Sequence, residues 1–526
     1  MRFSLLFLLI SFAGIALPGK AQIEGISIVS AENYFQDKDY RNALAGFEDY
    51  LLNIKFDRNI AYRAGISACR LGIEKRAVFH LQSARNAGLK DSYFTYWMGR
   101  AFLQDNQWDS ATVYLNEYMD VFPVDRVYQN EASTFLRNIE FAKSIAAKNL
   151  QPMVIENMGP GINSPYSEFH PLLTRDGQTM VINSRKRGFI DEKLFDDGEY
   201  KEKIFISKLQ EDGTWSRAVP IKLNEGKVRD NDFVAIQLIN DGTKLLLYKI
   251  VKETAHLFLA DYVDGTFRIP YQIPIEPDPR FFSGDIIFSD DLKSCIFTMD
   301  GKTNTFQNDL YSSRFDEKSG NWTEPVSLGK NINTNREEGS PFLIGDTILY
   351  YSSRRENGLG EFDIFCSVKD KKGNWGIPKN LGFPFNTANN DLYFYKSLAD
   401  TSITYISSLR GSTKGLADIY RIYRTAVTGG SSKILDDNGN ALANQSLVFE
   451  DPENFQNIPV KTDSEGKFSS NFVAGVNYQI TISKGEKIYE AYYKISFPIQ
   501  AGTAPAVIRL QQRILIKPEA PQESIE

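Results

Sequence analysis

The most regular feature of the chain is a short apolar strand that recurs five times between residues 160 and 425. Each copy ends in an aromatic residue, and successive aromatic positions lie 53, 53, 54 and 55 residues apart. Each repeat also contains an apolar strand followed by a tight turn, such as Asp176-Gly177, whose glycine accepts positive φ. A fixed period built from strand-like segments predicts one four-stranded sheet per repeat. The copies are Lys203-Ile204-Phe205, His256-Leu257-Phe258, Asp309-Leu310-Tyr311, Asp363-Ile364-Phe365 and Asp418-Ile419-Tyr420.

The first four repeats end in a hairpin that carries an aromatic residue, which the fifth repeat lacks. Its missing part matches the start of the region, where Asn157-Met158-Gly159 precedes Ile162-Asn163. The same arrangement recurs at 327–333 and at 380–386. We therefore predict that the segment around Val154 completes the fifth sheet. A five-bladed ring over residues 151–426 would then leave no exposed sheet edges, and a sixth, degenerate blade is the alternative.

A second period, of 34 residues, runs through residues 24–125, within a predicted helical domain of residues 24–150. Small residues at paired positions predict helix pairs that approach closely, and bulky residues fill the gap to the next pair. Residues 126–150 are expected to form a closing helix. The small residues are Ala31, Gly65 and Gly99, then Ala43, Ala77 and Ala111, and the bulky ones are Phe47, Leu81 and Leu115.

After Thr428-Gly429-Gly430 the pattern becomes that of a small all-β domain, residues 430–512. Strands are expected at 432–435, 446–450, 458–462, 467–471, 478–483, 491–497 and 506–511. Asp436, Asn438 and Asn440 could mimic a calcium loop, but no distal Glu follows at the required spacing, so a hairpin turn is favoured. Residues 513–526 combine proline and charge without apolar partners, which predicts a disordered tail.

The N-terminal 21 residues have the pattern of a secretory signal peptide. Arg2 precedes an apolar run over 3–17, and Gly19-Lys20-Ala21 is a plausible cleavage site. A membrane anchor is the alternative, but the run is short. Removing the segment changes the net charge of the 526-residue chain from −6 to −8. Because the sequence shows no basic stripe, a nucleic-acid partner is not expected. The signal peptide predicts that the chain is exported.

Residues with catalytic or metal-binding chemistry are few and scattered. The cysteines Cys69, Cys295 and Cys366 are expected to be buried thiols, and the three histidines fall in different repeats. We predict no catalytic residues, metal or cofactor, although paired carboxylates on loops stay open. Arg185, Arg354 and Arg410 follow second strands and are expected to form salt bridges between sheets rather than a binding site. Residues 189–202 contain six acidic residues and predict a solvated loop, with partner docking or cation binding as alternatives.

These patterns resemble three known families. The 34-residue period is similar to the tetratricopeptide repeat, and the D-G, S-x-R and D-I-Y/F pattern resembles TolB-type, WD-repeat-like propellers. The T-D-x-x-G-x-F element at 462–468 resembles the carboxypeptidase regulatory-like sandwich. The implied fold class is multidomain α plus all-β: an α-solenoid, a five-bladed β-propeller and a small β-sandwich. This order resembles Bacteroidetes-type periplasmic envelope proteins, among them PorE-like proteins of type IX secretion, although this chain ends where their OmpA-like domain would begin.

The resemblance implies a non-enzymatic scaffold in the periplasm, associated with the outer membrane. It would bind other envelope proteins, such as components of type IX secretion or gliding machinery. A glycan- or peptidoglycan-binding protein is the alternative, and a propeller hydrolase acting on glycans is a third. By the family analogy, a partner-binding groove would be lined by seven residues, which could instead pack against the chain's own propeller. These are Glu32, Tyr62, Arg70, Tyr93, Tyr96, Arg100 and Gln104.

Overall fold

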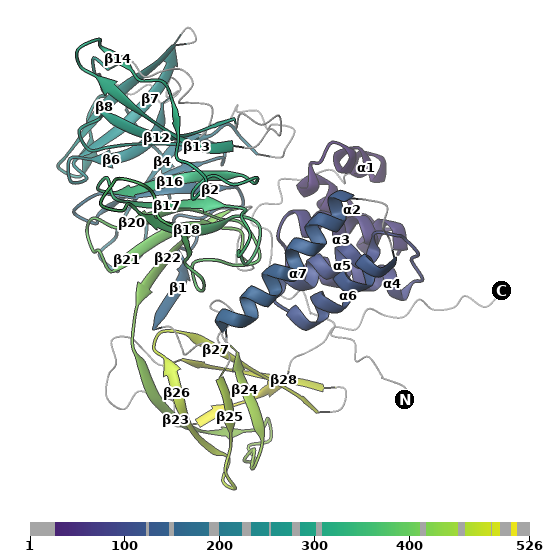
Figure 1. Cartoon of the computed structure of the whole chain (residues 1–526). Helices are drawn as coiled ribbons and strands as arrows, with labels where there is room; N and C mark the ends of the chain where they lie inside the picture. Colours follow the sequence, from purple (N-terminus) through teal and green to yellow (C-terminus); the bar gives the residue numbers. More distant parts are fainter. Residues whose placement is uncertain are drawn as a thin grey trace. The chain divides into compact units, whose positions relative to one another are not determined.

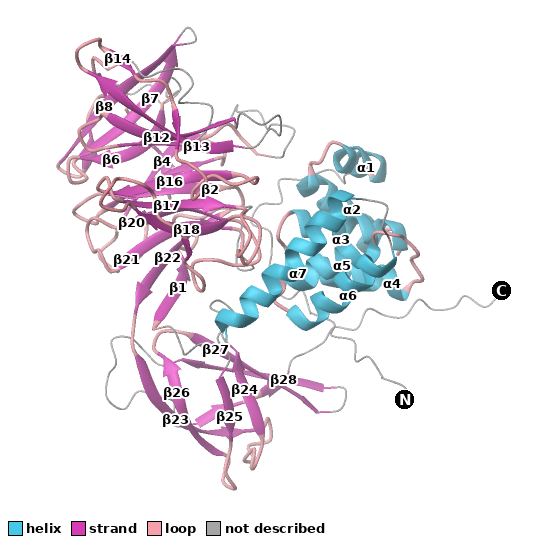
Figure 2. Ribbon diagram, viewed as in Figure 1, coloured by secondary structure: helices cyan, strands magenta, loops and turns pink. Residues whose placement is uncertain are grey.

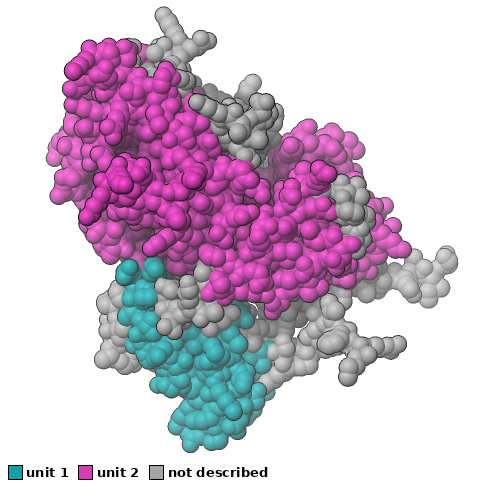
Figure 3. Space-filling model, in the orientation of Figure 1, with its two compact units in different colours: residues 1–26, 149–154, 424–526 teal, residues 27–148, 155–423 magenta. Residues whose placement is uncertain are grey.

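The computed structural model describes residues 27–121, 126–146, 152–188, 199–223, 233–251, 254–275, 285–300, 308–410, 417–450, 458–484, 487–494 and 507–512. The predicted signal peptide, most of the acidic segment 189–202 and the predicted tail lie outside these residues. The described part is a mixed α/β protein in which helices precede antiparallel sheets (Figures 1 and 2). Two compact units emerge: residues 27–148 with 155–423, and residues 149–154 with 424–526 (Figure 3).

Seven helices are found in the described residues, all before the first sheet. Several begin at a side chain that caps free backbone N–H groups, as Asp57 does for Asn59 and Ile60. The helices are α1 (Ile28–Gln36), α2 (Tyr40–Asn53), α3 (Arg58–Arg70), α4 (Glu74–Asn86), α5 (Phe94–Gln104), α6 (Trp108–Val121) and α7 (Arg126–Ala146).

The small residues of the 34-residue period are where the paired helices touch. Ala31, Ala43, Ala77 and Ala111 are fully buried. A methyl group on Gly65 would lie 2.6 Å from Leu81 Cγ, and one on Gly99 would lie 2.6 Å from Leu115 Cγ. The bulky residues of the pattern therefore fill the space that the glycines leave, which confirms the predicted pairing of α3 with α4 and of α5 with α6.

Five antiparallel sheets follow the helices, one for each predicted repeat. Their orders are β2-β3-β4-β5, β10-β8-β7-β6, β11-β12-β13-β14, β16-β17-β18-β19 and β1-β22-β21-β20, with β9 on β8 and β15 on β13. The period-marking strands are β4 (Lys203–Lys208), β8 (Thr254–Val263), β13 (Asn308–Asp316), β18 (Asp363–Val368) and β22 (Asp418–Arg424).

The remaining strands of the five sheets complete each repeat. They are β1 (Met153–Asn157), β2 (Glu168–Leu173), β3 (Thr179–Ser184), β5 (Val219–Pro220), β6 (Val234–Ile239), β7 (Lys244–Val251), β9 (Thr266–Phe267), β10 (Tyr271–Gln272), β11 (Ile286–Phe288), β12 (Ser294–Asp300), β14 (Asn321–Trp322), β15 (Val326–Ser327), β16 (Glu338–Ile344), β17 (Ile348–Ser353), β19 (Lys379–Asn380), β20 (Asp391–Lys396) and β21 (Ile403–Ser408). Because β1 lies beside β22, the prediction that the segment around Val154 completes the fifth sheet is confirmed.

Three asparagines that the sequence repeats show how these segments attach. Asn163 Nδ2 donates to Ile419 O at 2.9 Å, and Ile419 N–H donates to Asn163 Oδ1 at 2.8 Å. Asn333 makes the same pair of bonds with Leu310, and Asn386 makes it with Ile364. Each amide thus acts as an additional strand residue, but only Asn163 joins positions 256 residues apart.

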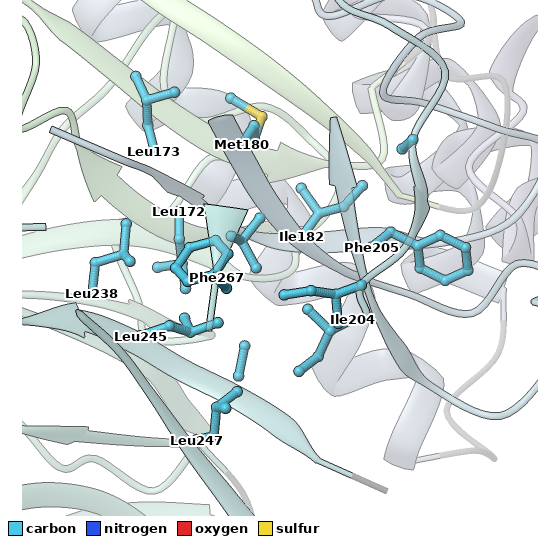
Figure 4. Packing of buried hydrophobic residues seen from close by; sticks show 14 of the residues in the cluster. Leu172, Leu173, Met180, Ile182, Ile204, Phe205, Leu238, Leu245, Leu247 and Phe267 are labelled. Atoms are coloured by element: carbon cyan, nitrogen blue, oxygen red, sulfur yellow. The ribbon is translucent and has the colours of Figure 1, made fainter. Parts of the chain in front are cut away.

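Neighbouring sheets pack through their first strands. β2 contacts β20 and β6, β6 contacts β11, β11 contacts β16, and β16 contacts β20. An apolar cluster lies between the sheets of β2 and β6, where Ile182, Leu245 and Leu247 are fully buried (Figure 4). First strands carry bulges at equivalent places, and the bulge residues His170, Ser340 and Tyr393 have positive φ.

The C-terminal unit contains two sheets, as the all-β pattern predicts. Their orders are β26-β23-β29 and β25-β24-β27-β28-β30. Asp436 Oδ1 accepts hydrogen bonds from Asn438 N–H and Asn440 N–H, which is the favoured hairpin turn. The strands are β23 (Val427–Leu435), β24 (Ser446–Glu450), β25 (Ile458–Lys461), β26 (Lys467–Val473), β27 (Asn477–Lys484), β28 (Lys487–Lys494), β29 (Val507–Arg509) and β30 (Gln511–Gln512).

Candidate functional site

The predicted groove on the helices is partly occupied by the chain itself. Arg100 of α5 is only 8% exposed, and its Nη2 donates to Glu361 Oε1 at 2.8 Å. Its guanidinium carbon lies 5.9 Å from the ring centre of Trp97 and 5.6 Å from that of Phe135. Burial raises the pKa of Glu361, but the charges of Arg100 and Arg354 outweigh that effect and hold it below its usual range. Arg100 thus binds a carboxylate, and Glu361 of the same chain supplies it.

Two polar side chains extend this contact. Gln104 Nε2 donates to Asn389 Oδ1 at 2.9 Å, and Asn138 Nδ2 of α7 donates to the carbonyl of Gly360 at 3.1 Å. Both side chains are at least 94% buried. The prediction that Arg100 and Gln104 line a groove open to a partner is therefore wrong for these two residues. They pack against the sheets, as the alternative interpretation had it.

A second contact of the same kind joins α2 to the first sheet. The Glu199 carboxylate, 2% exposed, lies 3.6 Å from Arg41 Nη2 and 3.2 Å from Arg185 Nη1. Arg354 contacts Glu361 in the same way. Arg185 and Arg354 both follow the second strand of their sheets. The sheets therefore present two equivalent glutamates, each held by a repeat arginine, to two arginines on the helices.

The expected salt bridges between sheets are not what these repeat arginines form. Arg185 and Arg354 bind glutamates of their own repeats, and Arg410 binds Asp391 of its own sheet at 2.9 Å. The reason is local, because each arginine follows the second strand of its sheet. For Arg185 and Arg354 the nearby carboxylate lies in the loop to the third strand. For Arg410 it lies at the start of the first strand, β20.

The other predicted groove residues contact neighbouring helices. Tyr62 Oη donates to Asp91 at 2.7 Å, Tyr96 is fully buried with its hydroxyl on Glu131, and Glu32 forms an ion pair with Arg63. Arg70 is exposed and stacks over Trp97 at 4.8 Å, and the half-buried Tyr93 ring lies 5.2 Å from Tyr128. Tyr96 is thus a core residue, whereas the partner-binding role of Glu32, Tyr62, Arg70 and Tyr93 stays a prediction.

A polar cluster that the sequence reasoning missed lies where the first strands of the sheets meet. The carboxylate of Asp285, just before β11, accepts hydrogen bonds from Ser340 N–H at 2.7 Å and from Tyr393 Oη at 3.0 Å. The His170 ring stacks on Tyr393 at 5.4 Å. Burial lowers the pKa of His170 to about 4, so its imidazole is neutral at neutral pH. We call Asp285, Ser340, Tyr393, His170 and Glu202 the axial cluster.

Glu202, just before β4, completes this cluster with a second carboxyl group. Burial, and then the charge of Asp285, raise the pKa of Glu202 to about 7, against the opposing charge of Arg185. The charge of Asp285 thus acts on Glu202, so the two carboxyl groups interact electrostatically. No motif marks these residues, because they come from different repeats.

His170, Ser340 and Tyr393 also line a cavity of about 560 Å³. Its walls are largely apolar, with Leu172, Ile287 and Phe342 among the side chains that form them. The turns after the first strands contribute Asp241, Asp290, Asp291 and Asp346 to its lining. Such a volume lies in the range of small-ligand sites.

The remaining predicted chemistry can be placed briefly. Cys69 and Cys295 are buried as expected, but Cys366 is half-buried. His80 bonds Glu48 between helices, and His256 contacts Gln272. Within the ranges that the structure describes, no group of three or more His, Cys, Asp or Glu residues is arranged to hold a metal ion. Over the same ranges, no helix combines the length and apolar character that a membrane span requires.

Comparison with known proteins gives likeness of fold only. No family model matches the chain, and no curated protein matches it. A solved protein of unknown function from Dyadobacter fermentans is 10% identical with a TM-score of 0.29, covering 67% of this chain and 97% of its own. TolB from Acinetobacter baumannii is 13% identical with a TM-score of 0.26, covering 57% and 71%.

A third solved structure is an exo-beta-1,3-galactanase from Phanerochaete chrysosporium. It is 10% identical with a TM-score of 0.32, and covers 62% of this chain and 97% of its own. Scores and identities of this size leave the family of the chain open.

Proposed function

We propose that the five sheets are the blades of a closed five-bladed propeller and that the helices form a tetratricopeptide-type stack fixed to one end of it. On this proposal the chain is a non-enzymatic scaffold that binds partner proteins through the other end. It acts in the periplasm, associated with the outer membrane, in machinery such as that of type IX secretion or gliding. The observation that carries the proposal is the pair of arginine–glutamate–arginine contacts described above.

On this proposal the two ends of the sheets have opposite roles. Glu199 and Glu361 lie in loops between second and third strands, whereas the turns between first and second strands lie at the other end. Those turns expose six carboxylates and contain two bases, Arg175 and Lys293, while Lys208 and Lys369 interact with Asp176 and Asp346 from neighbouring strands. The carboxylates are Asp176, Asp241, Asp290, Asp291, Asp346 and Asp400. A surface of this charge favours a partner with a basic patch, since complementary charge speeds and selects association.

Crosslinking in intact cells, followed by mass spectrometry of the attached chains, tests the scaffold proposal. We expect partner proteins attached near the turns, with lower yield when Asp241, Asp290 and Asp346 are changed to Asn. Matched controls change the exposed Glu117 and Glu140 of α6 and α7 to Gln. Recovery of the chain without attached proteins, or equal yields for both sets of variants, contradicts the proposal.

The axial cluster favours a second candidate, a glycan-binding or glycan-hydrolysing protein. Glycoside hydrolysis uses a pair of carboxyl groups, and this cluster contains the carboxyl groups of Glu202 and Asp285. A polysaccharide panel tests it by pull-down and by release of reducing sugar. This candidate is supported over the scaffold if Glu202→Gln and Asp285→Asn each abolish the activity. The variant Glu317→Gln, at an exposed site, should keep it. A glycan bound without turnover supports the binding form.

A further inference from the structure

An exposed apolar segment lies at the end of α2 and in the turn that leads to α3. The side chains of Leu52, Ile54 and Phe56 are 83%, 68% and 53% exposed. Single exposed apolar residues are ordinary on a protein surface, but three large ones this close in the sequence form a patch. A patch of this kind marks a surface that contacts something other than water.

The fold of the helices does not require apolar residues at these positions. One period of 34 residues later, the equivalent positions hold Asn86, Gly88 and Lys90. The turn from α4 to α5 therefore forms without a large apolar side chain at any of the three places. Because the side chains in the first turn are also exposed, they do not stabilise the helix pair by burial.

Basic side chains accompany this apolar segment. Lys55 lies inside it, and Arg58 follows it at the start of α3. Arg58 Nη1 donates to the carbonyl of Gly88 at 3.2 Å, which brings the turn that carries Lys90 next to the segment. Lys55, Arg58 and Lys90 are exposed, and no ion pair within the described ranges engages them.

The carboxylates of the same region are engaged by donors of the chain itself. Each of three aspartates accepts hydrogen bonds from its own surroundings: Asp49 from Asn53, Asp57 from Asn59 and Ile60, and Asp91 from Tyr62 and Tyr93. Lysine and arginine have longer side chains, whose stems cover apolar surface while their charges extend outward. The segment therefore presents free cationic groups around an apolar tip.

We propose that residues 52–58, together with Lys90, bind the surface of a membrane that contains anionic lipid. The three apolar side chains enter the boundary between headgroups and acyl chains, and the bases contact the lipid phosphates. Apolar insertion and attraction to anionic lipid reinforce each other in peripheral binding.

A lipid surface fits these side chains better than a protein partner does. Side chains this exposed project outward, and a fluid lipid layer accommodates them without a matching pocket. A stable protein contact would require a complementary surface of about 800 Å² on each partner. This inference rests on the proposed association with the outer membrane and assigns that association to one segment.

Flotation of the purified full chain with lipid vesicles tests the apolar part of the proposal. One set of vesicles is phosphatidylcholine, and the other is equal parts phosphatidylcholine and phosphatidylglycerol. We expect binding to the second set, and Ile54→Gln/Phe56→Gln should weaken it by about tenfold or more because the insertion is lost. Val113→Gln/Ile377→Gln is the matched control: it removes two exposed apolar side chains elsewhere and should leave affinity within about twofold.

The basic part is tested by charge variants and by salt. Lys55→Gln/Lys90→Gln should weaken binding to the phosphatidylglycerol vesicles by about tenfold, and added salt should weaken binding of the parent chain. Lys371→Gln/Lys372→Gln removes two exposed lysines after β18 and should bind as the parent chain does.

Three results would overturn the proposal. The first is a parent chain that floats with neither set of vesicles, and the second is equal binding of the segment variants and their controls. The third is self-association of the parent chain in light scattering that Ile54→Gln/Phe56→Gln abolishes, without binding to vesicles, since the segment would then contact a second copy.

Amide hydrogen exchange locates the contact on the unsubstituted chain. Phosphatidylglycerol vesicles should slow exchange over residues 54–58 and leave residues 370–374 unchanged, and unchanged exchange over 54–58 contradicts the proposal. Vesicle binding involves no partner protein, so its failure leaves the crosslinking result at the acidic turns unaffected. A failed crosslinking experiment likewise leaves vesicle binding unaffected.

Discussion

Asn163→Ala should weaken the structure at the point where the first and last segments of the five-sheet region meet. The substitution removes the bonds to Ile419 O and Ile419 N–H, and the bond from Asn163 Nδ2 to Asn157 Oδ1 at 2.9 Å. Ile419 is fully buried, so its N–H is left without a partner at a cost of roughly 1–3 kcal/mol. With the lost bonds included, we expect the free energy of unfolding to fall by about 3 kcal/mol.

The chain provides two matched controls for this variant. Asn333 and Asn386 make the same bonds, but to residues only 23 and 22 positions away, whereas Asn163 and Ile419 are 256 apart. Opening a loop about eleven times longer releases roughly 2 kcal/mol more chain entropy. The three alanine variants should thus show a similar fall in the free energy of unfolding. In Asn163→Ala, however, the pairing of β1 with β22 should open locally far more often.

Urea unfolding and hydrogen exchange measured by mass spectrometry separate the two effects. We expect Asn163→Ala to speed amide exchange along the whole of β1 and β22. Asn333→Ala and Asn386→Ala should speed it only near Leu310 and Ile364, the residues to which these asparagines bond. The reasoning is refuted if Asn163→Ala costs less than about 0.5 kcal/mol while Asn386→Ala costs the expected amount. It is also refuted if exchange in β1 and β22 is the same in all three variants.

Three further predictions follow from buried contacts. Gly99→Ala should cost about 1–3 kcal/mol because its methyl group would meet Leu115 Cγ at 2.6 Å, and adding Leu115→Ala should recover part of that in thermal melts. Arg41→Met should cost about 1–3 kcal/mol, since the buried Glu199 loses a guanidinium counter-charge, and an equal loss in Arg63→Met, whose half-buried ion pair with Glu32 is better solvated, would contradict this. Burial raises the pKa of Glu338 from 4.5 to about 7, so the folded state holds its proton more tightly than the unfolded state. Stability should then fall by up to about 3 kcal/mol as pH rises from 4.5 to 7, and Glu338→Gln should remove that fall in denaturant titrations at several pH values.

The helices and sheets follow from the sequence because their signals are local and periodic. Gly65 and Gly99 mark helix contacts through spacing alone, and Asn163 could be recognised because its motif recurs at Asn333 and Asn386. The contact between Arg100 and Glu361 spans 261 positions and belongs to no repeat, so neither period predicts it.

The axial cluster was missed for a related reason. Its members occupy first-strand bulges or the residues just before strands, and their chemistry differs from one repeat to the next. Asp285, Ser340 and Tyr393 occupy neighbouring sheets without sharing a residue type. Sequence repetition therefore identifies the sheets, whereas the composition of this cluster depends on the positions at which the repeats differ.

The pairing of β1 with β22 has a consequence for how the protein is made. A polypeptide emerging from the ribosome releases β1 long before the strand that must lie beside it. Until residue 424 has followed, the earliest strand of the region waits with unpaired N–H and C=O groups, which other chains can capture. A chaperone that shields such a strand would therefore matter most during synthesis and least once the last repeat is complete.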